Sequence, residues 1–303
     1  MNANYGHIFY SPTGTLQITL NGPGCYYRKQ DYCKMCNYGG NNTITLLNAV
    51  QFVDDAIKQH PQASRILIGS NGSILDEREI SRSIVSAALS RIHDCSIKDI
   101  YIETHVNTIT KESLKYLKSE LPTKNITIEM GLESSNAYVL QSIINKDLDL
   151  SIVRESIELI HNYNMRAALN VIYGLWYDEA SMQADFIDTC YWASTRKADE
   201  IIVFLLHIKP GTLVYDWYID GKISPPSHRD FIEILPLIND EVLQKMYFSW
   251  YGEREEAINS DGIIPPSYDD LEQEKVMRFY YDFMRSSSGS ERSRLIYQFI
   301  HNH

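Results

Sequence analysis

The chain has 303 residues, of which 44% are hydrophobic and 22% are charged. These values are ordinary for a soluble globular protein of one large or two small domains, and they exclude a disordered chain. The 28 Lys and Arg residues stand against 39 Asp and Glu, so the formal net charge is -11. This balance argues against a protein that holds DNA or RNA through a broad basic face, because such binding depends on displacing counterions.

The first twenty residues contain no basic region followed by an apolar run, and the longest clean apolar run, residues 201–206, is far too short for a membrane span. We therefore expect no secretory signal, no membrane segment and a cytoplasmic location. Cysteines stay reduced in that compartment. A local group of cysteines then indicates a metal site or catalysis before a disulfide.

A predicted strand at residues 16–20 leads directly into a cysteine-rich loop. Cys25, Cys33 and Cys36 fall within twelve positions of this loop. Thiolates on one loop can converge on a single soft metal centre. A structural zinc site needs four ligands, whereas a 4Fe–4S cluster held by three cysteines keeps one iron open for a substrate or cofactor. The count of three therefore favours an iron–sulfur cluster.

Other interpretations of the cysteines stay open. A thioredoxin-like redox pair would use Cys33 and Cys36 but leaves Cys25 unexplained. A zinc site would need His7 or His60 as its fourth ligand, and neither has the spacing of a zinc finger. The two remaining cysteines are isolated in helical stretches and are expected to be packed thiols.

Beyond the cysteine loop, β-rich runs alternate with helical patterns. Strands are predicted at residues 16–20, 65–69, 99–104, 125–130, 167–173 and 200–207. Helices are predicted at residues 45–59, 77–92, 111–121, 137–144 leading into 151–163, and 180–194. Six such units imply parallel strands with right-handed crossovers. This pattern fits either an open doubly wound sheet or a barrel.

Polar residues follow several of these strands, at the sheet edge where both architectures place their active sites. Acidic or amide side chains at this edge can accept hydrogen bonds from ribose hydroxyls. The alternative for the loop at residues 69–73 is a plain turn, with Asp76 capping the helix that begins near Glu77. The candidate ligand-binding residues at the strand ends are Gly72, Ser73, Glu103, Glu133, Ser134 and Asn170.

The cysteine motif resembles that of the radical S-adenosylmethionine (radical SAM) superfamily. Cys25, Cys33 and Cys36 match its three cluster ligands, although seven residues separate the first two cysteines where three are common. The widened gap is similar to the branch that holds the Elongator catalytic subunit and the radical SAM subunit of archaeosine synthase. Met35 occupies the position before the last cysteine, which often contacts adenine in this superfamily.

Further matches to that branch extend over residues 16–230. The segment from Gly72 to Asp76 resembles the archaeosine-synthase branch, which implies that Gly72 and Ser73 lie near the methionine amino group. Residues 102–105 resemble its Glu-Thr-Arg motif with His105 in place of the arginine, and residues 131–134 and 144–146 match its fourth-strand region. Residues 170–175 resemble a motif of coproporphyrinogen dehydrogenases, with Asn170 at the position of a ribose-binding aspartate.

The resemblance implies a partial (β/α)6 TIM-type barrel over residues 1–230. From the sequence pattern we expect a mainly helical C-terminal extension over residues 231–303, with helices at residues 271–285 and 291–301, that covers the barrel or mediates contacts. It implies a 4Fe–4S cluster and S-adenosylmethionine as cofactors, and an electron donor such as flavodoxin or ferredoxin. One electron would cleave the cofactor to a 5′-deoxyadenosyl radical, which abstracts hydrogen from the substrate. The protein would orient the reactants and exclude water.

For the substrate we expect a small molecule, an amino-acid or nucleoside derivative of a biosynthetic pathway. A tRNA base, as in archaeosine synthase, is the alternative, which the negative charge disfavours. A motif for a second cluster and a cobalamin domain are not visible in the sequence, which leaves lyase, isomerase or bond-forming chemistry. A zinc-stabilised binding protein and a regulator that binds S-adenosylmethionine without cleaving it stay open as non-catalytic alternatives.

Overall fold

The computed structural model describes residues 5–29, 33–35, 43–176, 178–249 and 262–302. The described residues form two compact units. Unit 1 comprises Met1–Tyr32, Tyr38–Gly131 and Leu148–Ala168, and unit 2 comprises Cys33–Asn37, Leu132–Asp147 and Leu169–His303. The strands β5 (Asn125–Glu133) and β6 (Arg166–Tyr173) begin in unit 1 and end in unit 2.

The strand order distinguishes the two architectures that the sequence left open. Eight strands are hydrogen-bonded in chain order, β1 to β8, and pairing is parallel from β2 to β5 and between β7 and β8. A doubly wound sheet reverses its order at a switch point, whereas a barrel wall always adds the next strand at the same edge. The order is therefore of the barrel type. The other strands are β1 (Gly6–Tyr10), β2 (Thr15–Leu20), β3 (Arg65–Ser70), β4 (Asp99–Thr104), β7 (Glu200–Leu205) and β8 (Met246–Phe248).

Two rows of buried aliphatic side chains hold β2 to β5 in register within unit 1. Ile18, Ile68, Ile102 and Ile128 lie opposite one another in successive strands, and each is fully buried. A second row, two residues earlier in each strand, consists of Leu16, Ile66, Ile100 and Ile126. A slip by one residue would turn each row to the opposite face of the sheet, so this pattern specifies the register strongly.

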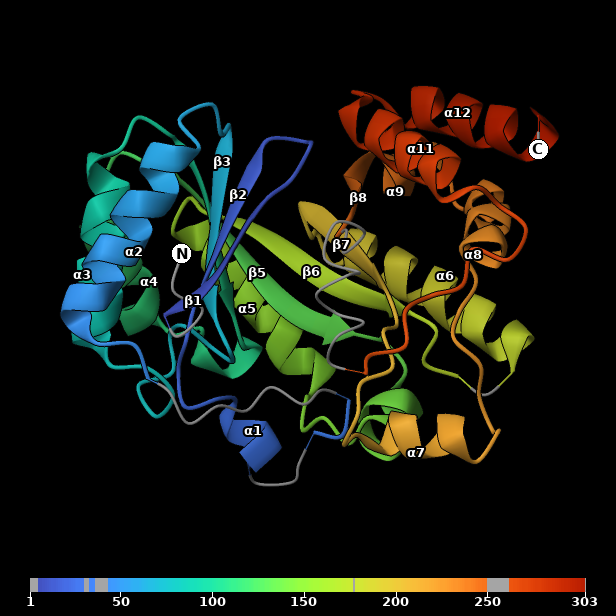
Figure 1. Cartoon of the computed structure of the whole chain (residues 1–303), viewed down its shortest axis with the longest axis horizontal. Helices are drawn as coiled ribbons and strands as arrows, with labels where there is room; N and C mark the ends of the chain where they lie inside the picture. Colours follow the sequence, from blue (N-terminus) through green and yellow to red (C-terminus); the bar gives the residue numbers. More distant parts are fainter. Residues whose placement is uncertain (1–4, 30–32, 36–42, 177, 250–261, 303) are drawn as a thin grey trace. The chain divides into compact units, whose positions relative to one another are not determined.

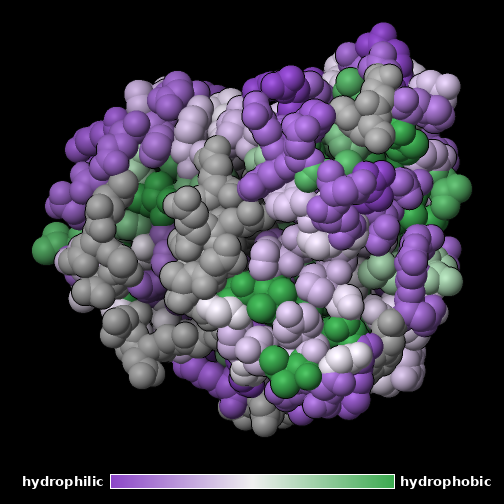
Figure 2. Space-filling view, turned by 45° about the vertical axis from the view of Figure 1, so that its right-hand side comes forward, coloured by the Kyte–Doolittle hydropathy of each residue, from purple (hydrophilic) through white to green (hydrophobic). Residues whose placement is uncertain are grey.

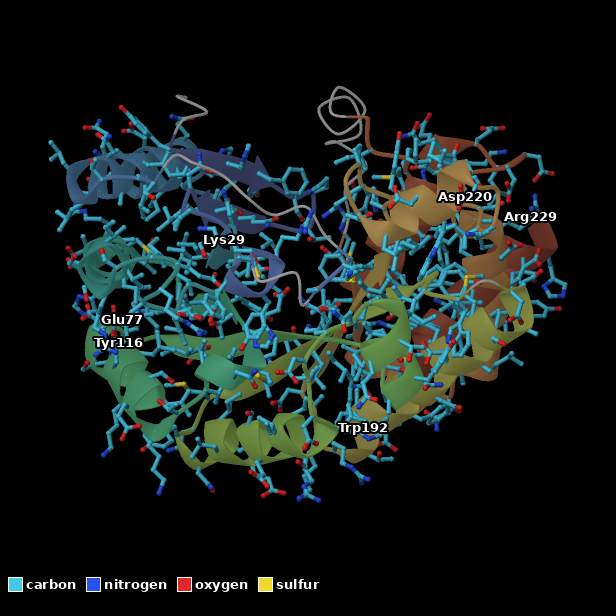
Figure 3. All side chains as sticks on the ribbon, turned by 90° about the horizontal axis from the view of Figure 1, so that it is seen from below. Lys29, Glu77, Tyr116, Trp192, Asp220 and Arg229 are labelled. Carbon is cyan, nitrogen blue, oxygen red and sulfur yellow. The ribbon has the colours of Figure 1, made fainter. Side chains whose placement is uncertain are left out.

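The helices of unit 1 are α2 (Leu46–Gln59), α3 (Arg82–Asp94), α4 (Lys111–Glu120) and α5 (Leu150–Asn162), with the short turns α1 (Tyr26–Lys29) and η1 (Val106–Thr108). Helix α3 contacts both α2 and α4, and the three helices lie side by side next to β2 and β3 (Figure 1). Between α3 and α4, the Ser86 hydroxyl lies 2.9 Å from the Tyr116 hydroxyl, and Tyr116 lies near Glu77 (Figure 3).

The predicted helix at residues 77–92 is wrong at its start. Helix α3 begins at Arg82, after Ser81. Asp76 lies well before this start, and its Oδ1 accepts the main-chain N–H of Arg78 while the carboxylate also binds the Arg78 guanidinium. Residues 76–80 instead form a turn that buries Ile80. The apolar spacing of α3 continues backwards into this turn, which is why the sequence pattern placed the helix start too early.

Unit 2 contains the helices α6 (Glu179–Thr195), α7 (Leu213–Ile219), α8 (His228–Ile234), α9 (Asp240–Lys245), α11 (Gln273–Arg285) and α12 (Gly289–Asn302), the π-helical turn η2 (Val139–Ile143) and the 3-10 turn η3 (Leu235–Leu237). The helices expected at residues 271–285 and 291–301 are present as α11 and α12. The sequence did not predict β1, β8, α7, α8 or α9. Aromatic rings form the core of this unit, with Phe231 at 5.3 to 5.6 Å from Tyr173, Phe186 and Phe248 between ring centroids.

Hydrophilic residues predominate on the face drawn in Figure 2, and hydrophobic ones occur there in small groups. Two exposed apolar side chains, Leu46 and Leu47, lie at the first turn of α2. Within the described ranges, no helix has both the length and the apolar composition that crossing a membrane requires.

A buried arginine joins α12 to the end of α9 and the start of β8 in unit 2. Arg292 is 2% exposed, and its Nη1 donates to the carbonyls of Leu243 at 2.5 Å and Met246 at 2.6 Å. Its guanidinium also lies over the Phe283 ring, 4.7 Å from the centroid. Main-chain carbonyls thus accept the hydrogen bonds of this cation, and the charges of Glu200 and Glu291 favour its ionised form.

We predict that Arg292→Met lowers the free energy of unfolding by about 2–4 kcal/mol, because it keeps the apolar stem and leaves buried carbonyls without donors. Urea denaturation measures the change. Arg294→Met, at an exposed position of the same helix, is the control and should change the value by less than about 0.5 kcal/mol. Equal urea midpoints for the two variants would contradict this role of Arg292.

Candidate functional site

Cys25 lies in unit 1, in the connection that follows β2. It is half-buried, and α1 begins at the next residue, with the N–H of Lys29 donating to the Cys25 carbonyl at 3.1 Å. The thiol is not in a disulfide. Helix α1 occupies the first part of the widened gap between Cys25 and Cys33. The cysteine is therefore held at the start of a helical turn at the carboxyl end of the first parallel strand.

Gly72, in the loop after β3, lies directly against Cys25. A Cβ atom at position 72 would be 2.9 Å from the Cα of Cys25 and would collide with Oε2 of Glu79. Side chains do not tolerate such a distance, so this close contact between two main chains requires glycine. The structure thus brings together two of the predicted site residues, Cys25 and Gly72, within one unit.

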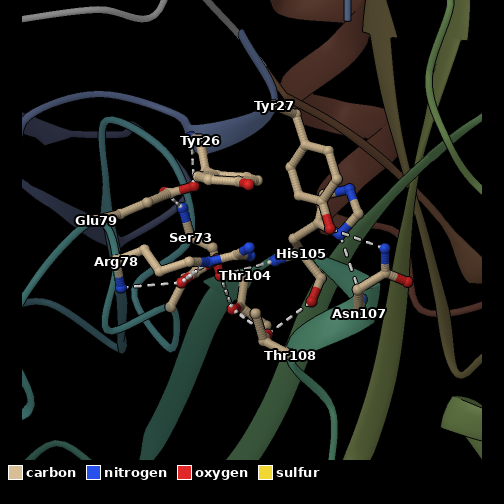
Figure 4. Close-up of polar contacts among 10 residues, drawn as sticks. Tyr26, Tyr27, Ser73, Arg78, Glu79, Thr104, His105, Asn107 and Thr108 are labelled. Carbon is tan, nitrogen blue, oxygen red and sulfur yellow. Dashed lines mark hydrogen bonds and ion pairs between the residues drawn. The ribbon is translucent and has the colours of Figure 1, made fainter. Parts of the chain in front are cut away.

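Glu79 connects the same two segments. Its Oε1 accepts the N–H of Tyr26 at 2.6 Å, and its Oε2 accepts the N–H of Ser73 (Figure 4). The side chain is 3% exposed. Burial raises the pKa of the Glu79 carboxyl, and the two main-chain N–H groups oppose that rise. The sequence analysis did not single out this residue.

A chain of hydroxyl groups joins the ends of β3 and β4. The Ser73 hydroxyl lies 2.5 Å from that of Thr104 and accepts the N–H of His105 at 3.1 Å. The Thr104 hydroxyl lies 2.8 Å from that of Thr108. These bonds fix the predicted site residue Ser73 to the loop that carries His105 (Figure 4).

His105 stands where the related branch has an arginine, and its ring stacks on Tyr27 of α1. The ring centroids are 4.3 Å apart and the planes differ by 17°. The N–H of Asn107 donates to Nδ1 of His105 at 3.2 Å, and the Asn107 side-chain amide donates to the Tyr27 hydroxyl at 2.9 Å. The replacement of arginine by histidine therefore leaves a flat aromatic pair beside the residue that follows Cys25.

A cation–aromatic contact joins Tyr26 of α1 to the turn at residues 76–80. The Arg78 guanidinium lies 3.8 Å from the centre of the Tyr26 ring and pairs with Asp76 at 2.5 Å. Burial opposes ionisation of Asp76, but the hydrogen bonds and the charge of Arg78 outweigh it, so the pKa of Asp76 falls below its usual range. The first turn of α1 is thus bound to the loop after β3 through both side chains and main chain.

Glu103, near the end of β4, is half-buried and lies over the neighbouring strand β3. A Cβ at Gly69 would be 3.1 Å from the Glu103 Cβ and 2.5 Å from its Oε2. Glycine at position 69 therefore makes room for the carboxylate. Of the predicted site residues, unit 1 carries Cys25, Gly72, Ser73 and Glu103.

Cys33 and Met35 belong to unit 2. Cys33 is buried, Met35 is half-buried, and the N–H of Lys34 between them donates to the Ile144 carbonyl at 2.8 Å. Cys36 lies outside the described residues. Within the described part of the chain, no three His, Cys, Asp or Glu residues form a group that could hold a metal ion. The three-cysteine cluster site thus stays a prediction.

Glu133, at the end of β5, has an unusual backbone and a buried partner. Its φ is 71°, and the N–H of Ser134 bonds to the Leu132 carbonyl at 3.0 Å, which is the strained form of the γ-turn. Its Oε1 accepts from Nζ of Lys146 at 2.8 Å, with both side chains 9% exposed. The ion pair thus ties the end of β5 to the segment after η2.

Ser134 has its hydroxyl engaged on both sides. It donates to Oδ1 of Asp185 on α6 at 2.7 Å and accepts the N–H of Asn136 at 2.9 Å. Burial raises the pKa of the Asp185 carboxyl, and the Ser134 hydrogen bond opposes the rise. Ser134 therefore shapes the loop after β5 through a buried carboxylate that the sequence analysis missed.

Asn170, near the end of β6, carries an acceptor that lacks a partner. Its Oδ1 is buried and has no hydrogen-bond partner among the described residues, and the same holds for the Tyr173 hydroxyl three residues later. Buried polar atoms are nearly always hydrogen-bonded, so an isolated acceptor at a strand end fits a site for a ligand hydroxyl.

These features fit the cofactors that the sequence motif implies. Cys25 and Cys33 supply thiol side chains, the loop at Gly72 permits the close approach of a backbone to a neighbour, and Asn170 offers an acceptor. The residues that the sequence analysis missed are Glu79 and Asp185, and it did not foresee that Lys146, within the matched segment 144–146, pairs with Glu133. Each is a charged side chain buried by tertiary contacts, and such burial has no local signature in a sequence.

No family model matches the chain. Its curated relatives include archaeosine synthase subunit beta of Methanosarcina acetivorans, 26% identical over 251 residues (76% of this chain, 71% of that protein), and that of Thermococcus kodakarensis, 28% identical over 237 residues (74% and 72%). An uncharacterised protein of Methanocaldococcus jannaschii is 26% identical over 232 residues, which are 73% of this chain and 63% of that protein. The chain thus spans less than two thirds of that last relative.

Solved structures with a similar fold include archaeal Elp3 of Methanocaldococcus infernus, with a TM-score of 0.53 and 12% identity over 80% of this chain and 57% of that one. Queuine lyase from Clostridium spiroforme, solved with SAM and queuine bound, has a TM-score of 0.53 and 17% identity over 81% and 94%. Methylornithine synthase has a TM-score of 0.53 and 11% identity over 89% and 75%. These likenesses confirm the predicted partial barrel fold.

We predict that Gly72→Ala lowers the free energy of unfolding by about 1–3 kcal/mol, because the new methyl group collides with Glu79 and Cys25. Amide hydrogen exchange should also rise in residues 22–29, which the collision displaces. Asn71→Ala removes atoms from the same loop and is the control. Unchanged exchange in residues 22–29 of the Gly72 variant would show that this contact does not hold α1.

We predict that Lys146→Met destabilises the protein by about 3–5 kcal/mol, because it leaves the Glu133 carboxylate buried without a partner. Adding Glu133→Gln should recover part of this loss, since the buried charge is then removed. Denaturant unfolding of the two single variants and the double variant measures the coupling. Strictly additive losses would mean that the two side chains do not interact.

The strand order and the similar solved structures agree on the fold, and the curated relatives come from the branch that the motifs resembled. The chain has the fold of the radical SAM enzymes, and in sequence it resembles the beta subunits of archaeosine synthase.

Proposed function

We propose that the chain is a radical SAM enzyme in which Cys25, Cys33 and Cys36 hold a 4Fe–4S cluster and S-adenosylmethionine binds beside it. The observation that carries the proposal is the three-cysteine motif, which begins directly after the first parallel strand of a fold shared with these enzymes. The cofactors, once bound and reduced, would supply a 5′-deoxyadenosyl radical that takes hydrogen from an unreactive carbon.

The chain's own residues would bind and orient. The main chain at Gly72 would face the methionine end of the cofactor, and the Asn170 oxygen would accept from a ribose hydroxyl. Met35, Ser73, Glu103, Glu133 and Ser134 are the further proposed contacts. Glu133 forms an ion pair with Lys146, and Ser134 donates a hydrogen bond to Asp185. We therefore assign Glu133 and Ser134 two roles, which are shaping the loop after β5 and contacting the cofactor.

For the substrate we propose a small molecule related to an amino acid or a nucleoside, with an electron donor such as flavodoxin or ferredoxin. The net charge of -11 supports a small molecule over a nucleic acid. A base within tRNA is the second candidate. It is supported by the names of the relatives from Methanosarcina acetivorans and Thermococcus kodakarensis. A reducing compartment, the cytoplasm, would suit a cluster with an open iron.

The experiment is anaerobic reconstitution with iron and sulfide, followed by dithionite and S-adenosylmethionine, with 5′-deoxyadenosine quantified by mass spectrometry. We predict that the wild-type chain forms this product and that the Cys25→Ala, Cys33→Ala, Cys36→Ala triple variant does not. The reason is that the variant lacks the thiolates that hold the cluster. Zinc without iron in the purified protein would contradict the proposal.

The same assay separates the two substrate classes. Nucleosides and amino-acid derivatives are added in one arm and bulk tRNA in the other, and the yield of 5′-deoxyadenosine is compared. Stimulation by free small molecules alone supports the first class, and stimulation by tRNA alone supports the second. Deuterium transfer from a labelled substrate into 5′-deoxyadenosine then identifies the carbon that loses hydrogen.

A further inference from the structure

One buried carboxylate sits between the two segments of unit 1 that the proposed function assigns to the cofactors. Glu79 accepts the N–H of Tyr26, the residue after Cys25, and the N–H of Ser73, the residue after Gly72 (Figure 4). Each oxygen takes one bond. The carboxylate therefore sets the separation of these two backbones at positions adjacent to Cys25 and Gly72.

Glu79 is itself held from outside these two segments. Its N–H donates to the Asp76 carbonyl at 2.9 Å, and the N–H of Ile80 donates to the same carbonyl at 3.0 Å. Ile80 is 2% exposed, and Arg78 pairs with the Asp76 side chain. Hydrogen bonds and an ion pair within residues 76–80 thus hold this turn in one conformation, which fixes the position of the Glu79 carboxylate.

The chemistry of the bridge requires a carboxylate. Two N–H groups point at one side chain, so that side chain must offer two acceptors next to each other. A glutamine has one acceptor oxygen and a donor NH2 group, which would oppose the second N–H. An aspartate has both acceptors but a stem shorter by one methylene. Hydrogen bonds from N–H groups to a charged acceptor are also stronger than those between neutral groups.

We propose that Glu79 is a positioning residue for S-adenosylmethionine: by bridging the N–H groups of Tyr26 and Ser73, it fixes the Gly72–Ser73 loop against the Cys25 turn at the separation that the cofactor needs. This inference rests on the proposed function. Glu79 would touch neither the cluster nor the cofactor. Its loss should therefore leave the cysteines able to take up iron while the affinity for S-adenosylmethionine falls.

The test compares Glu79→Gln and Glu79→Asp with Glu77→Gln, a matched control at an exposed glutamate of the same turn. Each reconstituted protein is assayed without reductant for iron content, for S-adenosylmethionine affinity by equilibrium dialysis, and for amide exchange. For Glu79→Gln we expect unchanged iron content, a rise in Kd of roughly 10- to 100-fold from the lost charged hydrogen bonds, and faster exchange in residues 22–29 and 70–76. Glu79→Asp should show a smaller rise in Kd, and Glu77→Gln none.

Equal affinity and exchange in the Glu79→Gln and Glu77→Gln proteins would overturn the inference. So would a loss of iron parallel to the loss of affinity, since the residue would then serve the general integrity of the site. If Glu79→Gln does not fold, the comparison of Glu79→Asp with Glu77→Gln decides in the same way. The proposed function fails separately, when wild-type protein binds S-adenosylmethionine but yields no 5′-deoxyadenosine after reduction.

Discussion

Parallel pairing in unit 1 determines where the loops that this unit contributes to the candidate site begin. Leu20 at the end of β2 lies opposite Ser70 at the end of β3, and Thr104 at the end of β4 lies opposite Met130 of β5. The buried aliphatic rows fix this register because a slip would expose them. As a result, the segments that carry Cys25, Gly72 and His105 all leave the sheet at one edge. The buried apolar side chains thus fix where these loops begin, and the hydrogen bonds among the loops then fix their detailed conformation.

Part of the widened gap between Cys25 and Cys33 forms the helical turn α1. The two tyrosines of α1 contact the loops after β3 and β4: Tyr26 under Arg78, and Tyr27 against His105. These two tyrosines thus pack against neighbouring loops of unit 1. The extra residues provide a small helical body with which the other loops of unit 1 make contact.

Much of the fold could be predicted from the sequence because its signals are local. The six strands of the repeating units and the helices between them follow from β-rich runs and apolar periodicity, and chain-order pairing was one of two arrangements those units allow. The short strands β1 and β8 could not be predicted, since pairing with β2 and β7 is what identifies them. The start of α3 was misplaced because Ile80 continues the helical apolar spacing although it lies in a turn.

The residues of the candidate site also divide into those that the sequence reveals and those that it does not. Glycines and strand-end polar residues such as Gly72 and Asn170 stood out because their positions next to predicted strands are visible in the sequence. Glu79 and Asp185 did not, because each looks like an ordinary surface residue until its burial and its partner are known; Lys146 lay in a matched segment, but its partner Glu133 was not predicted. The wrong start of α3 also concealed Glu79, which a helical interpretation places among solvent-facing positions. Cys36 lies outside the described residues, so the cluster ligands as a set remain a prediction from the motif.

The backbone at Glu133 carries a consequence for how substitutions at this position would be tolerated. A left-handed conformation costs a residue other than glycine about 1–2 kcal/mol, so glycine would relieve the turn that ends β5. Yet glycine would remove the carboxylate that pairs with the buried Lys146 side chain. The backbone conformation at position 133 therefore favours glycine, whereas the buried ion pair favours glutamate. A substitution table built from backbone geometry alone would rank glycine first at a position where the fold depends on the carboxylate.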